Sequence, residues 1–285
     1  MPRKELHEEN RIAWNAATLA HNSHKADQAA FLRAGGTTLF PEEVELLGDL
    51  SGHSLVHLQC NAGQDSLCLA RLGATVTGVD ISDEAIAFAR QLSLDSGIPA
   101  TFTRSDIYDW LAETTRRPER YDTAFSSYGV LPWLSDLQAW ARGIAASLKP
   151  GGRFVLVEFH PFAMTFEWDW SHSFSYFTGG APLTLESGIG DYVALAGEAL
   201  APSGYCEGTK DFVNPYRGHE FLWGLGEVTT ALLDAGLVIT TLREYPYMNG
   251  AKLFDRMREL PGTRMVPPED VPSLPLIVGL TATRP

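Results

Sequence analysis

Short apolar runs alternate with amphipathic runs between Leu55 and Phe159, a pattern typical of repeated strand–helix units around a mostly parallel sheet. We expect five buried strands in this part of the chain, at residues 54–58, 74–79, 100–103, 121–125 and 153–159. The clearest helix is predicted at 134–148, where apolar residues recur every three or four positions. A helical stripe at 228–235 and two further strands, at 237–242 and 276–280, are expected near the end of the chain. The pattern therefore predicts an α/β fold.

Two segments lack this alternation of strand and helix patterns. The run up to about Ala34 has a helical pattern but lies outside the predicted sheet. Residues 159–177 contain eight aromatic side chains, whereas the chain's average aromatic content of 11% would place about two there. Some of these aromatic residues alternate, so an extended segment would present them on one face. This face is expected either to bury itself in a hairpin against the core or a partner, or to form a lid over an apolar acceptor.

We therefore divide the chain into three expected parts. Residues 1–41 are predicted to form an N-terminal helical lid, and residues 162–225 a substrate-binding cap. The sheet domain would take residues 42–161 and 226–285. Whether the aromatic segment is a lid or an interface decides between a monomer and a homodimer, and the sequence leaves both open.

The charge balance narrows the class of partner. The chain has 22 Lys and Arg against 35 Asp and Glu, a formal charge of −13, which argues against binding nucleic acid or an anionic membrane. The three cysteines are too few and too scattered for a disulfide framework, and no apolar stretch is long enough to span a bilayer. We expect a cytoplasmic protein that acts on a small molecule.

Candidate chemistry begins at the ends of the predicted strands. The turn Gln59–Gly63 joins the first strand to a helix and keeps only one glycine of a nucleotide-binding fingerprint, so that signal alone is weak. Asp80 ends the second strand 17 residues after Gly63, close to where a ribose-hydroxyl acceptor sits in nucleoside-binding α/β folds. Asp106 follows the third strand, where it would either accept from an adenine amino group or cap the helix at 107–111.

Several motifs, in order, resemble those of class I S-adenosylmethionine-dependent methyltransferases. They are Leu58-Gln59-Cys60-Asn61-Ala62-Gly63-Gln64-Asp65-Ser66-Leu67, Val76-Thr77-Gly78-Val79-Asp80-Ile81-Ser82, Ser126-Ser127-Tyr128-Gly129-Val130-Leu131-Pro132-Trp133 and Leu148-Lys149-Pro150-Gly151-Gly152. The Leu-Gln-Cys turn and the N-terminal Asn10-Arg11-Ile12-Ala13-Trp14-Asn15 resemble a bacterial small-molecule branch of the family.

The resemblance implies a Rossmann-like, seven-stranded, mostly parallel sheet with helices on both faces and an inserted cap of antiparallel strands. It also implies methyl transfer from S-adenosylmethionine to a small, apolar or aromatic acceptor, at oxygen or nitrogen rather than carbon, with secondary metabolism as one setting. The alternative is a protein that binds S-adenosylmethionine for rearrangement or sensing without methylating. A nicotinamide-dependent dehydrogenase is disfavoured because two fingerprint glycines are missing.

The family motifs imply which residues bind. The expected cofactor residues are Trp14, Gln59, Cys60, Asn61, Gly63, Asp80, Ile81, Asp106, Ile107 and Ser126. The expected acceptor residues are Tyr128, Trp133, His160, Phe166, Trp168 and Trp223. Two departures stand out: His57 and Gln59 replace a common acid and glycine, and Trp223 lies where similar sequences tend to place a histidine.

The candidates for a proton-accepting residue are His160, Glu158, Tyr128 and His24. His160 comes first because it directly follows the fifth strand, although a strand-end histidine held by local hydrogen bonds fits the same position. If it acts as the base, His160→Ala should lower turnover at least tenfold. No metal is expected, since His21 and His24 lack a third ligand at a recognisable spacing.

Overall fold

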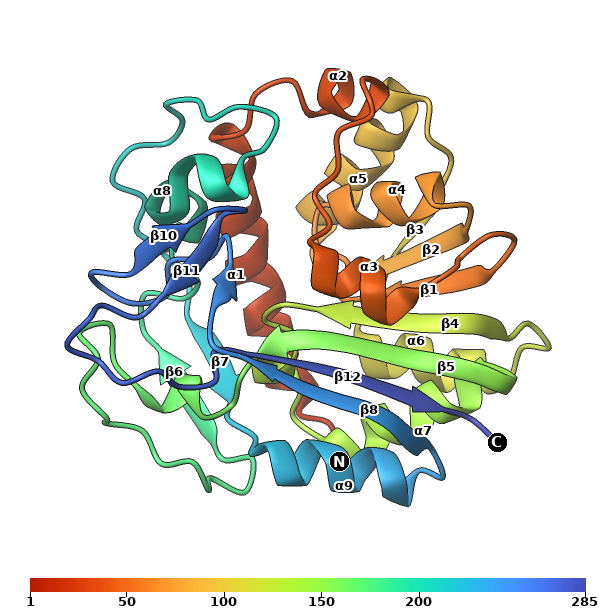
Figure 1. Ribbon diagram of the computed structural model, residues 1–285. Helices are drawn as coiled ribbons and strands as arrows, with labels where there is room; N and C mark the ends of the chain where they lie inside the picture. Colours follow the sequence, from red (N-terminus) through yellow and green to blue (C-terminus); the bar gives the residue numbers. More distant parts are fainter.

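The computed structural model describes residues 1–285 and is built on one seven-stranded sheet with the order β3-β2-β1-β4-β5-β12-β8 (Figure 1). The strands are parallel except β12, which runs antiparallel to both of its neighbours. Their bounds are Ser54–Leu58 (β1), Thr75–Asp80 (β2), Thr101–Arg104 (β3), Tyr121–Ser127 (β4), Leu148–Phe159 (β5), Val238–Tyr245 (β8) and Ile277–Thr283 (β12). All seven predicted strands are confirmed.

Helices cover both faces of the sheet, as expected. One face packs against α2 (Gln28–Arg33), α3 (Pro41–Leu47), α4 (Gln64–Arg71) and α5 (Asp83–Ser96). The other packs against α6 (Ile107–Thr114), α7 (Leu137–Ser147) and α9 (Leu225–Asp234). Within β1, Leu55 joins the first core and Val56 the second, because successive side chains point to opposite faces. The central strands of the sheet therefore contribute to two hydrophobic cores.

Helix α3 is absent from the sequence prediction. It begins at Pro41, whose fixed backbone angle suits a first helical position. The Glu43 carboxylate accepts from the Phe40 amide at 2.6 Å and so satisfies the helix start. This helix is short and buries acidic residues, so its apolar period is too weak to detect from the pattern alone.

Two insertions form the cap at the carboxyl edge of the parallel strands (Figure 1). The first, between β5 and α9, contains the antiparallel pair β6 (Pro182–Leu185) and β7 (Gly218–Phe221), with α8 (Tyr192–Ala196) between them. The second, between β8 and β12, was not expected. It forms a three-stranded sheet of β9 (Met248–Asn249), β10 (Arg258–Leu260) and β11 (Arg264–Val266).

The aromatic segment is irregular rather than a regular hairpin. Its only strand-like contact is a single bridge between Phe166 and His172. Trp170 is buried against Phe254, with ring centroids 4.4 Å apart, whereas Trp168 is 47% exposed. The alternation along the sequence therefore does not produce one shared aromatic face.

Helix α1 (Lys4–Ser23) lies between the sheet domain and the cap (Figure 1). Asn10 both accepts from the His219 amide at 2.6 Å and donates to its carbonyl at 2.9 Å, which ties α1 to β7. On the other side Arg11 pairs with Asp83, and Asn15 accepts from the Ser82 hydroxyl at 2.8 Å, at the start of α5. These contacts account for the N-terminal Asn-Arg-x-x-Trp-Asn motif as a bridge.

None of the helices combines the length with the apolar character needed to cross a bilayer.

Gly63→Ala should destabilise the fold more than Gly97→Ala. Both glycines have left-handed backbones, with φ of 79° and 71°. A Cβ on Gly63 would lie 2.6 Å from the Ala89 Cβ, whereas one on Gly97 would meet nothing within 4 Å. We expect a loss of about 1 kcal/mol at Gly97 from backbone strain, and about 2–4 kcal/mol at Gly63 from strain plus overpacking. Urea denaturation of both variants measures this, and equal losses would contradict the packing role.

Candidate functional site

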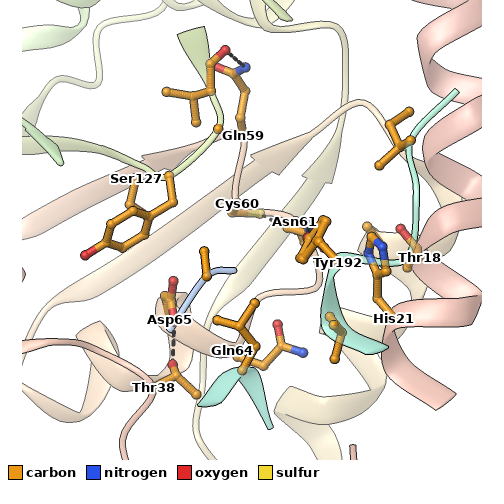
Figure 2. Close-up of a pocket in the computed structure, with 18 of the residues that line it drawn as sticks. Thr18, His21, Thr38, Gln59, Cys60, Asn61, Gln64, Asp65, Ser127 and Tyr192 are labelled. Carbon is orange, nitrogen blue, oxygen red and sulfur yellow. Dashed lines mark hydrogen bonds between the residues drawn. The ribbon is translucent and has the colours of Figure 1, made fainter. Parts of the chain in front are cut away.

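A cavity of about 1060 Å³ opens at the carboxyl ends of β1, β2 and β4, beneath α1 and the cap. This volume lies at the upper end of the range for small-molecule sites, roughly 300–1,000 Å³. In Figure 2 the first turn contributes Gln59, Cys60 and Asn61, while Thr18 and His21 approach from α1. The cavity stands where open α/β sheets bind their ligands, outside the carboxyl edge.

The first turn has the left-handed backbone conformation that favours glycine, although only one of its residues is a glycine. Gln59, Asn61 and Gly63 all have positive φ, at 56°, 49° and 79°. The Gln59 side-chain amide donates to the Val130 carbonyl at 3.0 Å, and the Asn61 side-chain oxygen accepts from the Ala62 amide at 2.6 Å. Left-handed geometry costs a non-glycine residue roughly 1–2 kcal/mol, and these bonds offset part of it. The missing glycines therefore leave the shape of the turn intact.

Gly63 itself does not line the cavity. It packs against Ala89 and Phe102 at the start of α4, so its expected role in binding is replaced by a role in packing. The neighbouring Cys60 and Asn61 do line the cavity, as expected.

Asp80 presents its carboxylate to the cavity from the end of β2. One oxygen accepts from the Asn61 amide at 2.8 Å and the other from the Ser82 amide at 2.9 Å. Burial raises its pKa, and the two amides oppose that rise. Each oxygen keeps a free lone pair, so the group can accept two more hydrogen bonds from a ligand. Ile81 lines the cavity beside it.

Asp106 both caps α6 and faces the cavity, so the two sequence readings are compatible. It accepts from the Tyr108 amide at 2.8 Å and lies 2.7 Å from Nδ1 of His7. Burial pushes its pKa up, but the hydrogen bond and charge of His7 leave it below the ordinary value. Ile107 also lines the cavity, next to Asp106.

The α1 face of the cavity was only partly foreseen. Trp14 was expected, but the cavity is lined by a whole stripe of this helix and the residues after it: His7, Asn10, Trp14, Thr18, His21 and Lys25. Their spacing of three or four residues is the period of a helix. The sequence carries a signal for this stripe, because polar and aromatic residues recur at helical spacing among the alanines of the helix.

Several buried polar atoms on cavity-lining residues have no partner in the protein: Thr18 Oγ1, His21 Nδ1, Gln59 Oε1 and Asn249 Oδ1. The His21 Nε2 lies 2.9 Å from the Gly190 carbonyl, so it must donate, and Nδ1 carries a lone pair. Burial lowers the pKa of His21 to about 4, which keeps the ring neutral. Buried polar groups are normally satisfied, so these atoms indicate a polar ligand.

The loop after β4 is held by a buried carboxylate. Glu158 accepts from the backbone amides of Gly129, Val130, Leu131 and Phe159, the last three at 2.7, 3.0 and 2.7 Å. Its burial raises its pKa against the effect of these amides. The bonds fix the backbone just after Tyr128, the residue that enters the loop with a positive φ of 39°.

A second network orients the Tyr128 hydroxyl. The Asn249 side-chain amide donates to the Tyr128 oxygen at 2.9 Å and to Glu42 at 3.0 Å. Glu42 is anchored in turn by the Tyr247 hydroxyl at 2.7 Å and by Arg264. Because the Tyr128 oxygen already accepts, its hydrogen is available to the cavity. Burial raises the pKa of Tyr128 well above 10, so it stays a neutral phenol.

Other expected residues differ in their access to the cavity. Trp133 lines it and packs edge-to-face on Trp14, with ring centroids 5.4 Å apart. Ser126 is buried within β4 and does not line the cavity, because strand alternation turns Ser127 toward it instead.

The structure places both candidate histidines outside the cavity. His160 accepts from the Phe162 amide at 3.1 Å, and its Nε2 lies 2.8 Å from Glu244 on β8. His24 is paired with Asp191 at 2.8 Å, which fastens the end of α1 to the cap. The expectation that the end of β5 aims His160 at the site is therefore wrong in geometry, because local bonds turn the ring toward β8.

Three expected acceptor residues also lie elsewhere. Phe166 packs in a satellite core near Trp170, and Trp168 reaches solvent. Trp223 donates its indole N–H to the Leu134 carbonyl at 2.7 Å. None of the three lines the cavity. Phe166 and Trp168 belong to the aromatic segment, which folds onto the cap, and Trp223 is held by its bond to Leu134.

His57, which stands in place of an expected acid, has a hydrogen-bond partner in the structure. Its Nδ1 lies 2.9 Å from the Ser66 hydroxyl, and burial lowers its pKa to about 3. A neutral imidazole therefore stands where an acid is common in the family.

Comparison with known proteins agrees with this architecture. Residues 56–152 match a family model described as "Methyltransferase domain". A ubiquinone biosynthesis O-methyltransferase from Xanthomonas euvesicatoria is 34% identical over 108 residues, covering 38% of this chain and 44% of that protein. Residues 56–152 thus contain a methyltransferase domain of the kind that this family model describes.

Solved structures extend the likeness to nearly the whole fold of this chain. A putative S-adenosylmethionine-dependent methyltransferase from Listeria monocytogenes aligns with a TM-score of 0.60 at 16% identity, covering 90% of this chain and 99% of that one. One from Mesorhizobium loti aligns with a TM-score of 0.55 at 20% identity, covering 86% and 96%. The curated relative, in contrast, is matched over less than half its length, so its own activity does not transfer directly.

Glu158→Gln should destabilise the protein by about 2–4 kcal/mol, because the amide brings donors toward backbone amides and removes the charge that they stabilise. Urea denaturation measures the loss. Glu167→Gln is the matched control, since Glu167 is exposed and makes no side-chain bond. A loss no larger than in the control would show that the carboxylate does not hold the loop.

Proposed function

We propose that this protein transfers a methyl group from S-adenosylmethionine to oxygen or nitrogen of a small, apolar or aromatic acceptor. The observation that carries the proposal is the Asp80 carboxylate, which is fixed by two backbone amides at the strand edge and still has lone pairs free for a ribose. A cavity with room for a second ligand continues from it.

The residues present fit the cofactor. Asp80 would accept the ribose hydroxyls, and Ile81, Asp106 and Ile107 would bound the adenine. At the other end, the unpartnered atoms of Thr18, His21 and Gln59 suit the amino and carboxylate groups of a methionine moiety, as does Lys25, whose pKa burial lowers to about 8. When bound, S-adenosylmethionine supplies a methyl group on a sulfonium, which is a good leaving group.

The rest of the cavity suits an apolar acceptor. Its wall includes Phe40, Tyr128, Phe159, Met164 and Leu253. The Tyr128 hydroxyl would donate to a polar atom of the acceptor and so orient it. Helix α1 and the cap would exclude water, and holding two reactants in line lowers the barrier of a displacement.

The net charge of the protein and the names of similar proteins narrow the chemical class of the acceptor. The formal charge of −13 disfavours a strongly anionic acceptor. The ubiquinone biosynthesis O-methyltransferases, by name, methylate oxygen, which favours oxygen here as well. We place the reaction in the cytoplasm, consistent with three free cysteines, and leave a monomer and a homodimer as the candidate states.

The reaction is tested by incubating the protein with methyl-labelled S-adenosylmethionine and a panel of phenols, alcohols and amines. Release of S-adenosylhomocysteine together with a labelled acceptor is the expected outcome. Tight binding of cofactor without any labelled product would instead support a protein that binds but does not methylate.

Asp80→Ala should weaken S-adenosylhomocysteine binding at least about 100-fold, since two hydrogen bonds to a charged group are lost, each about 1.5–3 kcal/mol. Titration calorimetry measures the affinity. The matched control is Asp95→Ala, which removes an exposed carboxylate on α5 and should bind like the parent protein. An unchanged affinity in Asp80→Ala would rule out the ribose role.

A further inference from the structure

Glu220, on β7, is a cavity-lining carboxylate that sequence analysis did not single out. Its side chain has no hydrogen-bond partner and no ion pair in the protein, whereas three other acids of the cavity accept hydrogen bonds: Asp65, Asp80 and Asp106. The two remaining lining acids, Glu198 and Glu259, are exposed to solvent. Glu220 is thus the one shielded acid of the cavity that has no hydrogen-bond partner in the protein.

The backbone around Glu220 is rigidly held. Glu220 pairs with Leu183 across the β6–β7 sheet, and its neighbour His219 is fixed by two backbone hydrogen bonds with the Asn10 side chain, one accepted and one donated. The His219 ring turns the other way, toward Glu9 at 2.9 Å. Strand alternation therefore directs Glu220 alone into the cavity.

Glu220 belongs to the part of the cavity that follows β4. Strand β7 packs against both α1 and the short helix Leu131–Trp133, which begins three residues after Tyr128. Trp14 and Trp133 line the cavity from these same two elements. The carboxylate accordingly faces an aromatic-walled space adjoining the strand end that would border the methyl donor.

A charged carboxylate without a hydrogen-bond or ion-pair partner is unfavourable in this shielded part of the cavity. Desolvation raises the pKa of Glu220 to about 7, so the group exchanges protons near neutral pH. A pKa near the working pH is the property that a general base requires. Strongly shifted pKa values are concentrated at functional sites.

We propose that Glu220 accepts the proton of a neutral aromatic hydroxyl during methylation, which makes phenols the acceptor class. The inference rests on the proposed function. The acceptor's O–H bond breaks and its proton moves to a Glu220 oxygen. The released electron pair forms the new bond from oxygen to the methyl carbon, and the pair of the broken carbon–sulfur bond stays on sulfur.

The first test needs no turnover. Carboxyl-¹³C NMR of the protein labelled at glutamate should show a resonance that titrates near pH 7 and is lost in Glu220→Gln. Because the folded pKa lies above the ordinary value of 4.5, the parent protein loses stability as pH rises from about 4.5 to 7. Glu220→Gln escapes this loss, so its melting temperature should exceed the parent's at about pH 8 and match it near pH 4.5.

The second test compares two phenols. With 4-methoxyphenol, Glu220→Gln should lower kcat at least about 100-fold, the lower end of the usual effect of a general base. With 4-nitrophenol, which is largely ionised at about pH 8 and has no proton to lose, the decrease should be less than about tenfold. The acid limb of the parent's pH–rate profile, near pH 7, should disappear in the variant. Glu186→Gln is the matched control, since Glu186 is an exposed, Arg217-paired acid outside the cavity on the same cap.

These outcomes separate the inference from the proposed function. S-adenosylhomocysteine calorimetry on both variants should match the parent, since Glu220 is assigned to the acceptor. If the parent methylates phenols and Glu220→Gln does so equally well, the role of Glu220 is wrong while the function stands. The absence of a resonance titrating near pH 7 would also overturn the inference. If the parent binds the cofactor but methylates neither phenol, phenols are the wrong class, and if it does not bind the cofactor, the proposed function itself fails.

Discussion

The Glu158 carboxylate, with four backbone amides converging on it, is the interaction on which the centre of the molecule depends. It stands at the end of β5 and holds the loop that leaves β4, so two adjacent parallel strands are locked at their carboxyl ends. The chain leaves β1 toward β2 on one side and β4 toward β5 on the other, which opens a crevice between them. Without an anchor the strained backbone at Tyr128 would relax and the crevice would lose its floor.

The sheet could be predicted because its signal is local. Each buried strand is a short apolar run ended by a turn or a cap, and Asp80 is recognisable because it ends such a run next to the first turn. It was harder to predict which of two neighbouring residues at a strand end faces the cavity. Ser126 and Ser127 are equivalent in the sequence, and only the register of β4 turns the second toward the cavity.

The cap could not be predicted in the same way, because it depends on contacts between distant segments. His160 seemed to point into the site from its position after β5, but Glu244, from a strand that is remote in sequence, turns it away. Glu220 lies in a stretch with no repeating pattern, and its exposure to the cavity follows from Asn10, which holds the neighbouring His219 from 209 residues earlier in the chain. Partial burial without a partner, the property that makes Glu220 stand out, has no trace in the sequence.

Helix α1 carries the polar stripe that faces the cavity and also the Asn10 clamp on β7. Helix α1 thus packs against both the sheet domain and the cap. Displacing α1 would therefore move the cofactor side of the cavity and β7, the strand that carries Glu220, together. The two ligand sites share one supporting helix.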